Sequence, residues 1–204
     1  MAEPTDRSEQ QPIADLLTLN IGVTGHRYLT GLDRIRKGIS NAFAEIERAF
    51  PDRPWNLISP LAEGADRLVA MEALKRSGAT LTVPLPMSES EYEKDFCSLA
   101  SQSEFRTLLD RAHSIVRLPL APDRQGAYWA AGCYVVDHCD VLIAVWDGNE
   151  TSGGAGTAAV VGYARVKSKP IVIVSAANAK PGTPESTKFD CDQGKLIVER
   201  LPNC

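Results

Sequence analysis

Short apolar runs alternate with helical patterns along most of the chain. The first run, Leu17–Val23, is followed by Asp33–Phe50, where apolar residues recur at three- and four-residue spacing, as on one face of a helix. Further strand-like runs lie at Trp55–Ser59, Ala79–Leu85, Ser114–Leu118, Val141–Trp146 and Ile171–Ser175. Further helical patterns lie at Gly64–Ser77, Phe105–Ala112, Ala127–Cys139 and Thr157–Val166, and another one begins at Ser88. The pattern therefore predicts strands and helices in alternation.

This alternation predicts βαβ units. The strands are almost continuously apolar, as expected when helices cover both faces of a parallel sheet. We therefore predict an α/β fold with a Rossmann-like, doubly wound, mostly parallel sheet of about six strands. We interpret residues 1–15 as a disordered leader, residues 16–178 as a Rossmann-like domain, and residues 179–204 as a linker or tail. The apolar stretch Leu196-Ile197-Val198 in that tail is either a further strand or the start of a second domain.

Composition limits which binding partners and which cellular compartment we expect. The chain has 204 residues and a net charge of -4, which favours neither duplex DNA nor an anionic membrane as a partner. No apolar run reaches the roughly 18 residues of a membrane helix, and the polar N-terminus lacks the apolar region of a signal peptide. The five cysteines form no C-x-x-C pair, so we expect reduced thiols and a cytoplasmic protein.

Candidate chemistry should lie just after the strands, because ligands bind beyond the carboxyl ends of strands in such sheets. The first such segment runs from Gly22 to Arg27 and includes Thr24, Gly25 and His26. Its glycines let backbone N–H groups approach a ligand, and Arg27 can bind phosphate oxygens through its guanidinium group. The alternative is an ordinary turn between a strand and a helix.

The second segment runs from Ser59 to Arg67. Gly64 permits close approach of the backbone, and Arg67 can reach either the pocket or solvent. Asp66 is a candidate helix cap, which would be a purely structural role. Glu63 is a candidate for binding a ribose hydroxyl or for acting as a catalytic carboxylate.

A third segment, after Leu85, offers Tyr92 and Asp95 as residues at the rim of a pocket. We expect the aromatic residues of the helical pattern at 127–139, Tyr128, Trp129 and Tyr134, to be mainly core. Cys133 and Cys139 are six residues apart and lie on different faces of that helix, so we expect no metal site. We also expect no resident cofactor.

The fourth segment is the most informative. A buried strand leads to Trp146, Asp147 and Gly148, and a glycine-containing stretch with Gly154, Gly156 and Thr157 then enters a helix. Backbone N–H groups at the start of that helix would point at an anion. Asp147 can accept hydrogen bonds from ribose hydroxyls or from the amino group of a base. The alternative is a disordered polar loop over Asn149–Gly154.

Three of these motifs together resemble the SLOG superfamily, whose Rossmann-like domains include the Lonely-guy phosphoribohydrolases and the DNA-processing protein A family. The matching stretches are Gly22-Val-Thr-Gly-His-Arg27, Glu63-Gly-Ala-Asp-Arg67, and Trp146-Asp-Gly with Gly154-Ala-Gly-Thr157. The resemblance covers roughly Leu17 to Ala177. It implies nucleotide binding at these loops, and many members look like ligand sensors in bacterial defence systems.

One position departs from the enzymatic branch of the superfamily. That branch resembles P-G-G-x-G-T-x-x-E, in which the final glutamate is catalytic. Here Val160 stands at the glutamate position and Ser152 at the proline position. A valine side chain can neither act as a base nor stabilise an oxocarbenium charge.

The leading hypothesis is therefore a binding or sensor domain for a phosphate-bearing nucleotide derivative, such as ADP-ribose or a cyclic nucleotide, in a homo-oligomer. The alternative is an N-glycosidase or a nucleoside deoxyribosyltransferase-like enzyme that uses Glu63 or Asp147. A third hypothesis, binding of single-stranded DNA, is disfavoured by the acidic balance and by the absence of a basic stripe.

Overall fold

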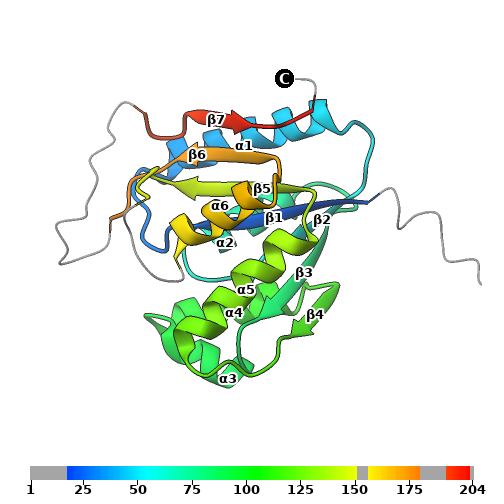
Figure 1. The fold of residues 1–204 in the computed structure, drawn as a ribbon. Helices are drawn as coiled ribbons and strands as arrows, with labels where there is room; N and C mark the ends of the chain where they lie inside the picture. Colours follow the sequence, from blue (N-terminus) through cyan, green and yellow to red (C-terminus); the bar gives the residue numbers. More distant parts are fainter. Residues whose placement is uncertain (1–17, 151–155, 180–191, 203–204) are drawn as a thin grey trace, which may run out of the picture.

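The computed structural model describes residues 18–150, 156–179 and 192–202, and strands alternate with helices from residue 19 to residue 175 (Figure 1). The strands are β1 (Leu19–Gly25), β2 (Trp55–Ile58), β3 (Thr80–Leu85), β4 (Ser114–Arg117), β5 (Val141–Trp146), β6 (Ile171–Ser175) and β7 (Leu196–Glu199). The helices are α1 (Leu32–Ala49), α2 (Ala65–Ala73), α3 (Glu89–Tyr92), the single turn η2 (Glu93–Asp95), α4 (Leu99–Leu109), α5 (Arg124–His138) and α6 (Thr157–Val166). The predicted leader, residues 1–15, lies outside the described residues.

All strands join one sheet in the order β4-β3-β2-β1-β5-β6-β7. The pairings from β4 to β6 are parallel, and β7 runs antiparallel to β6. The predicted Rossmann-like, mostly parallel sheet is confirmed, but it has seven strands rather than about six. The additional strand lies at one edge and contains only three apolar residues, so its hydrophobic pattern is weaker than that of a central strand.

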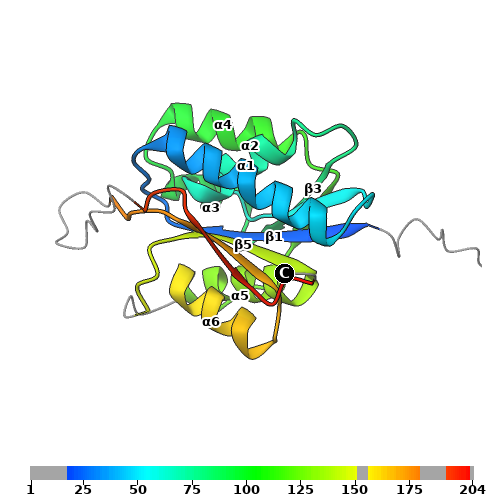
Figure 2. The ribbon, with the colours of Figure 1, turned by 90° about the horizontal axis from the view of Figure 1, so that it is seen from above.

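Helices cover both faces of the sheet. Figure 2 shows α1, α2, α3 and α4 on one face and α5 and α6 on the other. The central strand β5 is buried along its whole length, as its unbroken apolar run requires. On α1, the buried residues Ile35, Ile39 and Ile46 form the apolar face that packs against the sheet.

Two helices begin earlier than their apolar pattern predicts, because polar side chains cap them. Ser98 precedes α4, and its hydroxyl accepts the backbone N–H of Ser101 at 3.1 Å. Asp123 precedes α5, and its Oδ1 accepts the backbone N–H of Gly126 at 2.7 Å. Helix α2, in contrast, ends at Ala73, and turns replace the predicted helix up to Ser77.

Helix α5 packs tightly across β1 at Gly22. A Cβ atom on Gly22 would lie 2.8 Å from Val135 Cγ1 and 2.9 Å from Cys139 Cβ. The glycine therefore allows close approach of helix and strand, which brings the α5 surface near the end of β1. Within the described residues, no helix has both the length and the apolar character needed to cross a membrane.

Candidate functional site

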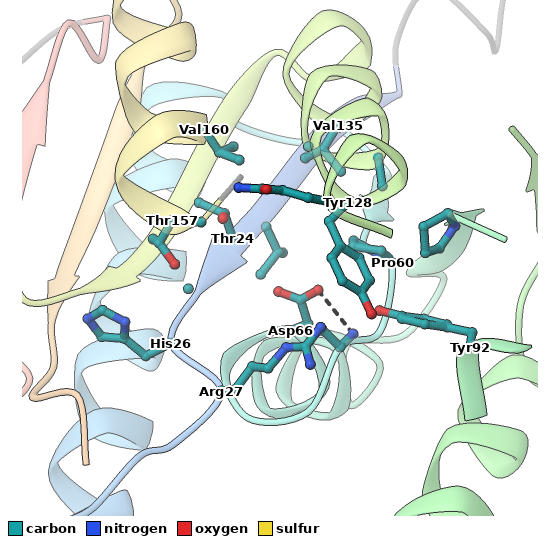
Figure 3. A pocket seen from close by; sticks show the side chains of 18 of the residues that line it. Thr24, His26, Arg27, Pro60, Asp66, Tyr92, Tyr128, Val135, Thr157 and Val160 are labelled. Carbon is teal, nitrogen blue, oxygen red and sulfur yellow. Dashed lines mark hydrogen bonds between the residues drawn. The ribbon is translucent and has the colours of Figure 1, made fainter. Parts of the chain in front are cut away.

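A pocket lies where the sheet reverses its strand order, between β1 and β5. The chain continues from β1 to β2 on one side and from β5 to β6 on the other, and such a switch point opens a crevice at the carboxyl ends of the strands. The pocket has a volume of about 640 Å³ (Figure 3), within the range of small-molecule sites. Its lining consists of Val23, Thr24, Gly25, His26, Arg27, Tyr28, Pro60, Ala62, Asp66, Pro86, Tyr92, Arg124, Gln125, Tyr128, Ala131, Gly132, Val135, Gly156, Thr157, Val160 and Asn178.

The pocket brings together part of the predicted site. Residues from all four predicted segments line it, namely Thr24, Gly25, His26, Arg27, Asp66, Tyr92, Gly156 and Thr157. Other predicted residues lie behind or beside the lining, namely Gly22, Ser59, Glu63, Gly64, Arg67, Trp146, Asp147 and Gly148. Gly154 lies outside the described residues.

Arg27 supplies a positive charge to the pocket. Its guanidinium carbon lies 5.1 Å from the centre of the Tyr128 ring, a distance typical of a cation–π contact. Burial works against the charge, but Tyr92, Tyr128 and Asp95 more than compensate and raise the pKa of Arg27. Arg27 forms no ion pair with any residue that the structure describes. Its charge is therefore available to an anion in the pocket.

His26 links the end of β1 to the end of β5 through hydrogen bonds. Its backbone N–H donates to Val145 O at 3.0 Å, and its Nε2 accepts the backbone N–H of Asp147 at 3.1 Å. Burial lowers the pKa of His26, although the nearby carboxylate of Asp147 opposes this effect. Asp147 in turn accepts the backbone N–H of Asn149 at 2.9 Å. His26, which lines the pocket, and Asp147, which does not, therefore hold two loops together at the pocket.

Asp66 is the carboxylate of the pocket lining. It lies in the first turn of α2, is 4% exposed, and accepts the backbone N–H of Ala62 at 3.2 Å. The capping role considered for it is wrong, because Gly64 occupies the N-cap position of α2. Burial raises the pKa of Asp66 to about 7, and the Ala62 N–H, Arg27, Arg67 and the Ser59 hydroxyl offset this only in part. Figure 3 shows the carboxyl group facing the same space as Arg27.

Gly64 is needed for the contact between the first loop (residues 22–27, which include the end of β1) and the second loop (residues 59–67). Its φ angle is +82°, and a Cβ atom there would lie 2.3 Å from Arg27 O. The next residue, Ala65, donates its N–H to His26 O at 3.0 Å. Gly64 thus serves backbone packing, which holds α2 and Asp66 against the end of β1.

Glu63 and Arg67 lie outside the pocket lining. Their side chains make contacts that hold the second loop in place. Arg67 is 1% exposed, donates to Leu61 O at 3.0 Å and Ser101 O at 2.8 Å, and lies over the Phe96 ring. Glu63 accepts hydrogen bonds from the Ser101 hydroxyl and from the Cys97 N–H at 3.0 Å. Although burial opposes the change, these hydrogen bonds lower the pKa of Glu63. Both side chains are therefore turned toward α4 rather than toward a ligand.

The start of α6 forms the wall opposite the second loop. Gly156 is the N-cap, Thr157 is the first helical residue, and both line the pocket. The first N–H groups of a helix have no partner within it and carry a partial positive charge. Val160, one turn further on, also lines the pocket and lies against Gly132 of α5.

Several lining residues were not among the predicted ligand residues. Tyr92 lines the pocket, in agreement with its interpretation as a rim residue, and Tyr128 lines it although we expected core. Tyr128 donates its hydroxyl hydrogen to Asp95, which also pairs with Arg124. The apolar pattern of a helix does not distinguish a pocket wall from the core, so the position of Tyr128 in the pocket could not be predicted from the sequence.

Comparison with known proteins identifies the fold. No protein-family model matches the sequence, and no curated protein matches it significantly. The structure of DNA processing protein A from Helicobacter pylori matches with a TM-score of 0.51 at 16% identity, over 86% of this chain and 69% of that one. DNA processing protein A from Streptococcus pneumoniae matches with a TM-score of 0.47 at 15% identity, over 77% of this chain. The chain spans 50% of that second protein.

The Helicobacter pylori match defines the class of protein at the level of the fold. At 16% identity, the Helicobacter pylori match supports a shared arrangement of strands and helices and nothing finer. The chain shares the Rossmann-like fold of that protein, and the predicted resemblance is confirmed at the level of the fold. The residues of the pocket must therefore carry the argument about function.

Proposed function

We propose that the chain is a binding domain for a phosphate-bearing small molecule derived from a nucleotide, such as ADP-ribose or a cyclic nucleotide. The observation that carries this proposal is Arg27, a cation in the pocket wall that has no ion pair among the described residues. Arg27 is half-buried, so solvent stabilises its charge only in part. An anionic ligand would supply a counter-charge.

The second support is the start of α6, which lies in the same pocket. The N–H groups of Gly156, Thr157 and Ala158 would bind phosphate oxygens, and the hydroxyls of Thr24 and Thr157 would add donors. The positive end of the helix amounts to about half an elementary charge. Arg27 and α6 together would therefore favour a ligand with one or two phosphate groups.

The third support is the apolar part of the wall. Val23, Ala131, Val135 and Val160 line the pocket beside these polar groups. A surface of this kind suits the face of a nucleobase, which is mostly apolar. The pocket is thus polar at the switch point and apolar against α5, as a nucleotide derivative requires.

The enzymatic alternative is weaker. Hydrolysis of an N-glycosidic bond needs a carboxylate that faces the anomeric carbon, and neither Glu63 nor Asp147 lines the pocket. Val160 lines it where the enzymatic relatives have glutamate. Asp66 is the remaining candidate. Release of ribose 5-phosphate from a nucleoside monophosphate, abolished by Asp66→Ala, would favour the enzyme.

Single-stranded DNA is a further candidate ligand. The Helicobacter pylori protein is described as having a unique mode of binding single-stranded DNA. The net charge of -4 does not favour such a ligand here. An unlabelled oligonucleotide belongs in the binding screen, and tight binding to it in place of small molecules would overturn the proposal.

The proposal is tested by calorimetry with ADP-ribose, cyclic nucleotides and nucleoside monophosphates. Arg27→Ala should weaken the ligand that binds by about 10- to 100-fold, because a charge-assisted hydrogen bond contributes about 1.5–3 kcal/mol. The matched control is Arg48→Ala, which removes an arginine with a 67% exposed side chain on α1. Equal affinity in the wild type and Arg27→Ala would remove Arg27 from the site.

The oligomeric state and the cellular location of the protein stay predictions. We expect a homo-oligomer in the cytoplasm, and sedimentation with and without ADP-ribose would measure its size. A monomer under both conditions would contradict the expected oligomer. It would leave the binding proposal intact, because every lining residue comes from this one chain.

A further inference from the structure

Asp66 stands out among the groups of the pocket, because it is a buried carboxyl with spare hydrogen-bonding capacity. One oxygen, Oδ2, accepts the Ala62 N–H at 3.2 Å, and the Ser59 hydroxyl also acts on the carboxyl group. Asp66 forms no ion pair with any residue that the structure describes. Figure 3 shows its carboxyl group directed into the pocket, with Arg27, Tyr92 and Tyr128 around it. Since the residue is only 4% exposed, solvent does little to stabilise a charge there.

The groups around Asp66 come from four elements. Arg27 follows β1, Arg67 is the next residue on α2, Tyr92 belongs to α3 and Tyr128 to α5. Arg67 directs its guanidinium to Leu61 O, Ser101 and Glu104, away from the carboxyl. The two tyrosines are neutral, and burial together with nearby charges raises the pKa of both. Arg27 is thus the main positive charge that faces Asp66 across the pocket.

The charges do not balance if an anion enters while Asp66 is ionised. A diphosphate diester brings two negative charges, whereas Arg27 contributes one positive charge and the start of α6 about half of one. Arg124 also lines the pocket, but it pairs with Asp95 at 3.4 Å and Glu91 at 3.5 Å. An ionised Asp66, which is only 4% exposed, would add a third negative charge. Like charges so close together disfavour ionisation.

We infer that Asp66 binds the ligand as a neutral carboxylic acid, donating a hydrogen bond to a phosphate oxygen, so that a diphosphate enters the pocket together with one proton. This inference rests on the proposed function and assigns a role to Asp66 within it. The proton comes from solvent whenever Asp66 is ionised in the empty pocket. Because the pKa of Asp66 lies at about 7 before binding, the uptake falls in an accessible range of pH.

The competing role for Asp66 is that of a charged acceptor for a sugar hydroxyl. The two roles differ in their dependence on pH. A neutral donor binds better below the pKa of the empty site, whereas a charged acceptor binds better above it. Asparagine at position 66 can replace a donor, because its amide donates hydrogen bonds, but it is a poor substitute for a carboxylate.

The experiment is calorimetric titration with ADP-ribose between about pH 6 and about pH 8, in two buffers with different enthalpies of ionisation. Its diphosphate is esterified at both ends and keeps its charge over this range. The wild type should bind about tenfold more weakly at the upper end, with uptake approaching about one proton per ligand. Asp66→Asn should bind at every pH about as tightly as the wild type does near pH 6, without proton uptake.

The matched control is Asp110→Asn, an exposed aspartate at the end of α4, which should keep the wild-type dependence on pH. Thermal unfolding checks that each variant folds, and proton uptake by the wild type needs no variant at all. Binding by the wild type without proton uptake, or loss of binding in a folded Asp66→Asn, would overturn the inference and leave the proposed function standing. No binding of ADP-ribose at any pH would count against both.

Discussion

Asp66 and Arg67 are neighbours in the sequence, yet their side chains serve different parts of the protein. Asp66 faces the pocket, whereas Arg67 is buried behind the second loop, where Leu61 has a left-handed φ angle of 58°. Successive residues of a helix point about 100° apart, so two adjacent charged residues rarely share one site. Arg67 therefore supports a strained loop conformation, and of the two residues only Asp66 lines the pocket.

The ionisation of Asp66 also predicts how stability depends on pH. Since its pKa is raised from 3.8 to about 7, the folded state binds the proton more tightly than the unfolded state. The contribution of Asp66 to stability is therefore fully present below about pH 4 and is lost as the pH rises to about 7. Asp66→Asn does not titrate. Its free energy of unfolding, relative to the wild type, should rise over this range by a few kcal/mol, on the order of 1.4 kcal/mol per pKa unit.

Urea unfolding of the wild type and Asp66→Asn at a series of pH values measures this difference directly. Other titrating groups, His26 included, are common to both proteins and cancel in the comparison. Asp110→Asn serves again as the control, with a difference from the wild type that stays constant. A difference for Asp66→Asn that does not change with pH would mean that the carboxyl is not perturbed by burial.

At the scale of elements, the glycines of the predicted loops act mainly through packing. Gly22 lets α5 approach β1, and Gly64 lets α2 approach the first loop. The sequence offered two interpretations for such glycines, ligand approach and backbone geometry. The structure supports the second for both of these positions. It does so through distances to particular atoms, which a sequence motif cannot supply.

Gly64→Ala should destabilise the protein by more than about 2 kcal/mol, because a positive φ angle and a blocked Cβ position act together. Gly162→Ala is the matched control. Gly162 lies within α6, and a Cβ atom there meets nothing within 4 Å. That substitution should stabilise the protein by about 0.5–1 kcal/mol. Thermal unfolding measures both, and equal stabilities of the two variants would contradict the packing role of Gly64.

The sequence predicted the central elements best. The predicted bounds of β5, β6 and α6 agree with the structure, because buried strands and the helix after a glycine stretch have strong patterns. The first turn of α6 and the loop after β1 were also identified as pocket residues. The contribution of α5 to the pocket wall was not predicted. Tyr128 reaches the pocket because α5 crosses β1 at Gly22. That crossing depends on tertiary packing, which periodicity along one helix does not encode.

At the scale of the whole molecule, the pocket lies where the two halves of the sheet meet. One half, β1 to β4, contributes Arg27 and Asp66, and the other, β5 to β7, leads to the start of α6. A phosphate bound to both halves would link them across the switch point. Ligand binding should therefore change the dynamics of the pocket walls and leave the outer edges of the sheet unaffected.

Hydrogen exchange with and without ADP-ribose measures this change. The N–H groups of Thr157 and Ala158 have no partner within α6 and should exchange markedly more slowly when phosphate oxygens accept their hydrogens. The N–H of His26 already donates to Val145 O at 3.0 Å and should change little. The antiparallel edge strand β7 contributes no residue to the pocket lining and should exchange at the same rate in both states. Arg27→Ala should show less protection than the wild type at a concentration of ADP-ribose that just saturates the wild type. Protection confined to β4 and α4 would instead indicate a site elsewhere on the molecule.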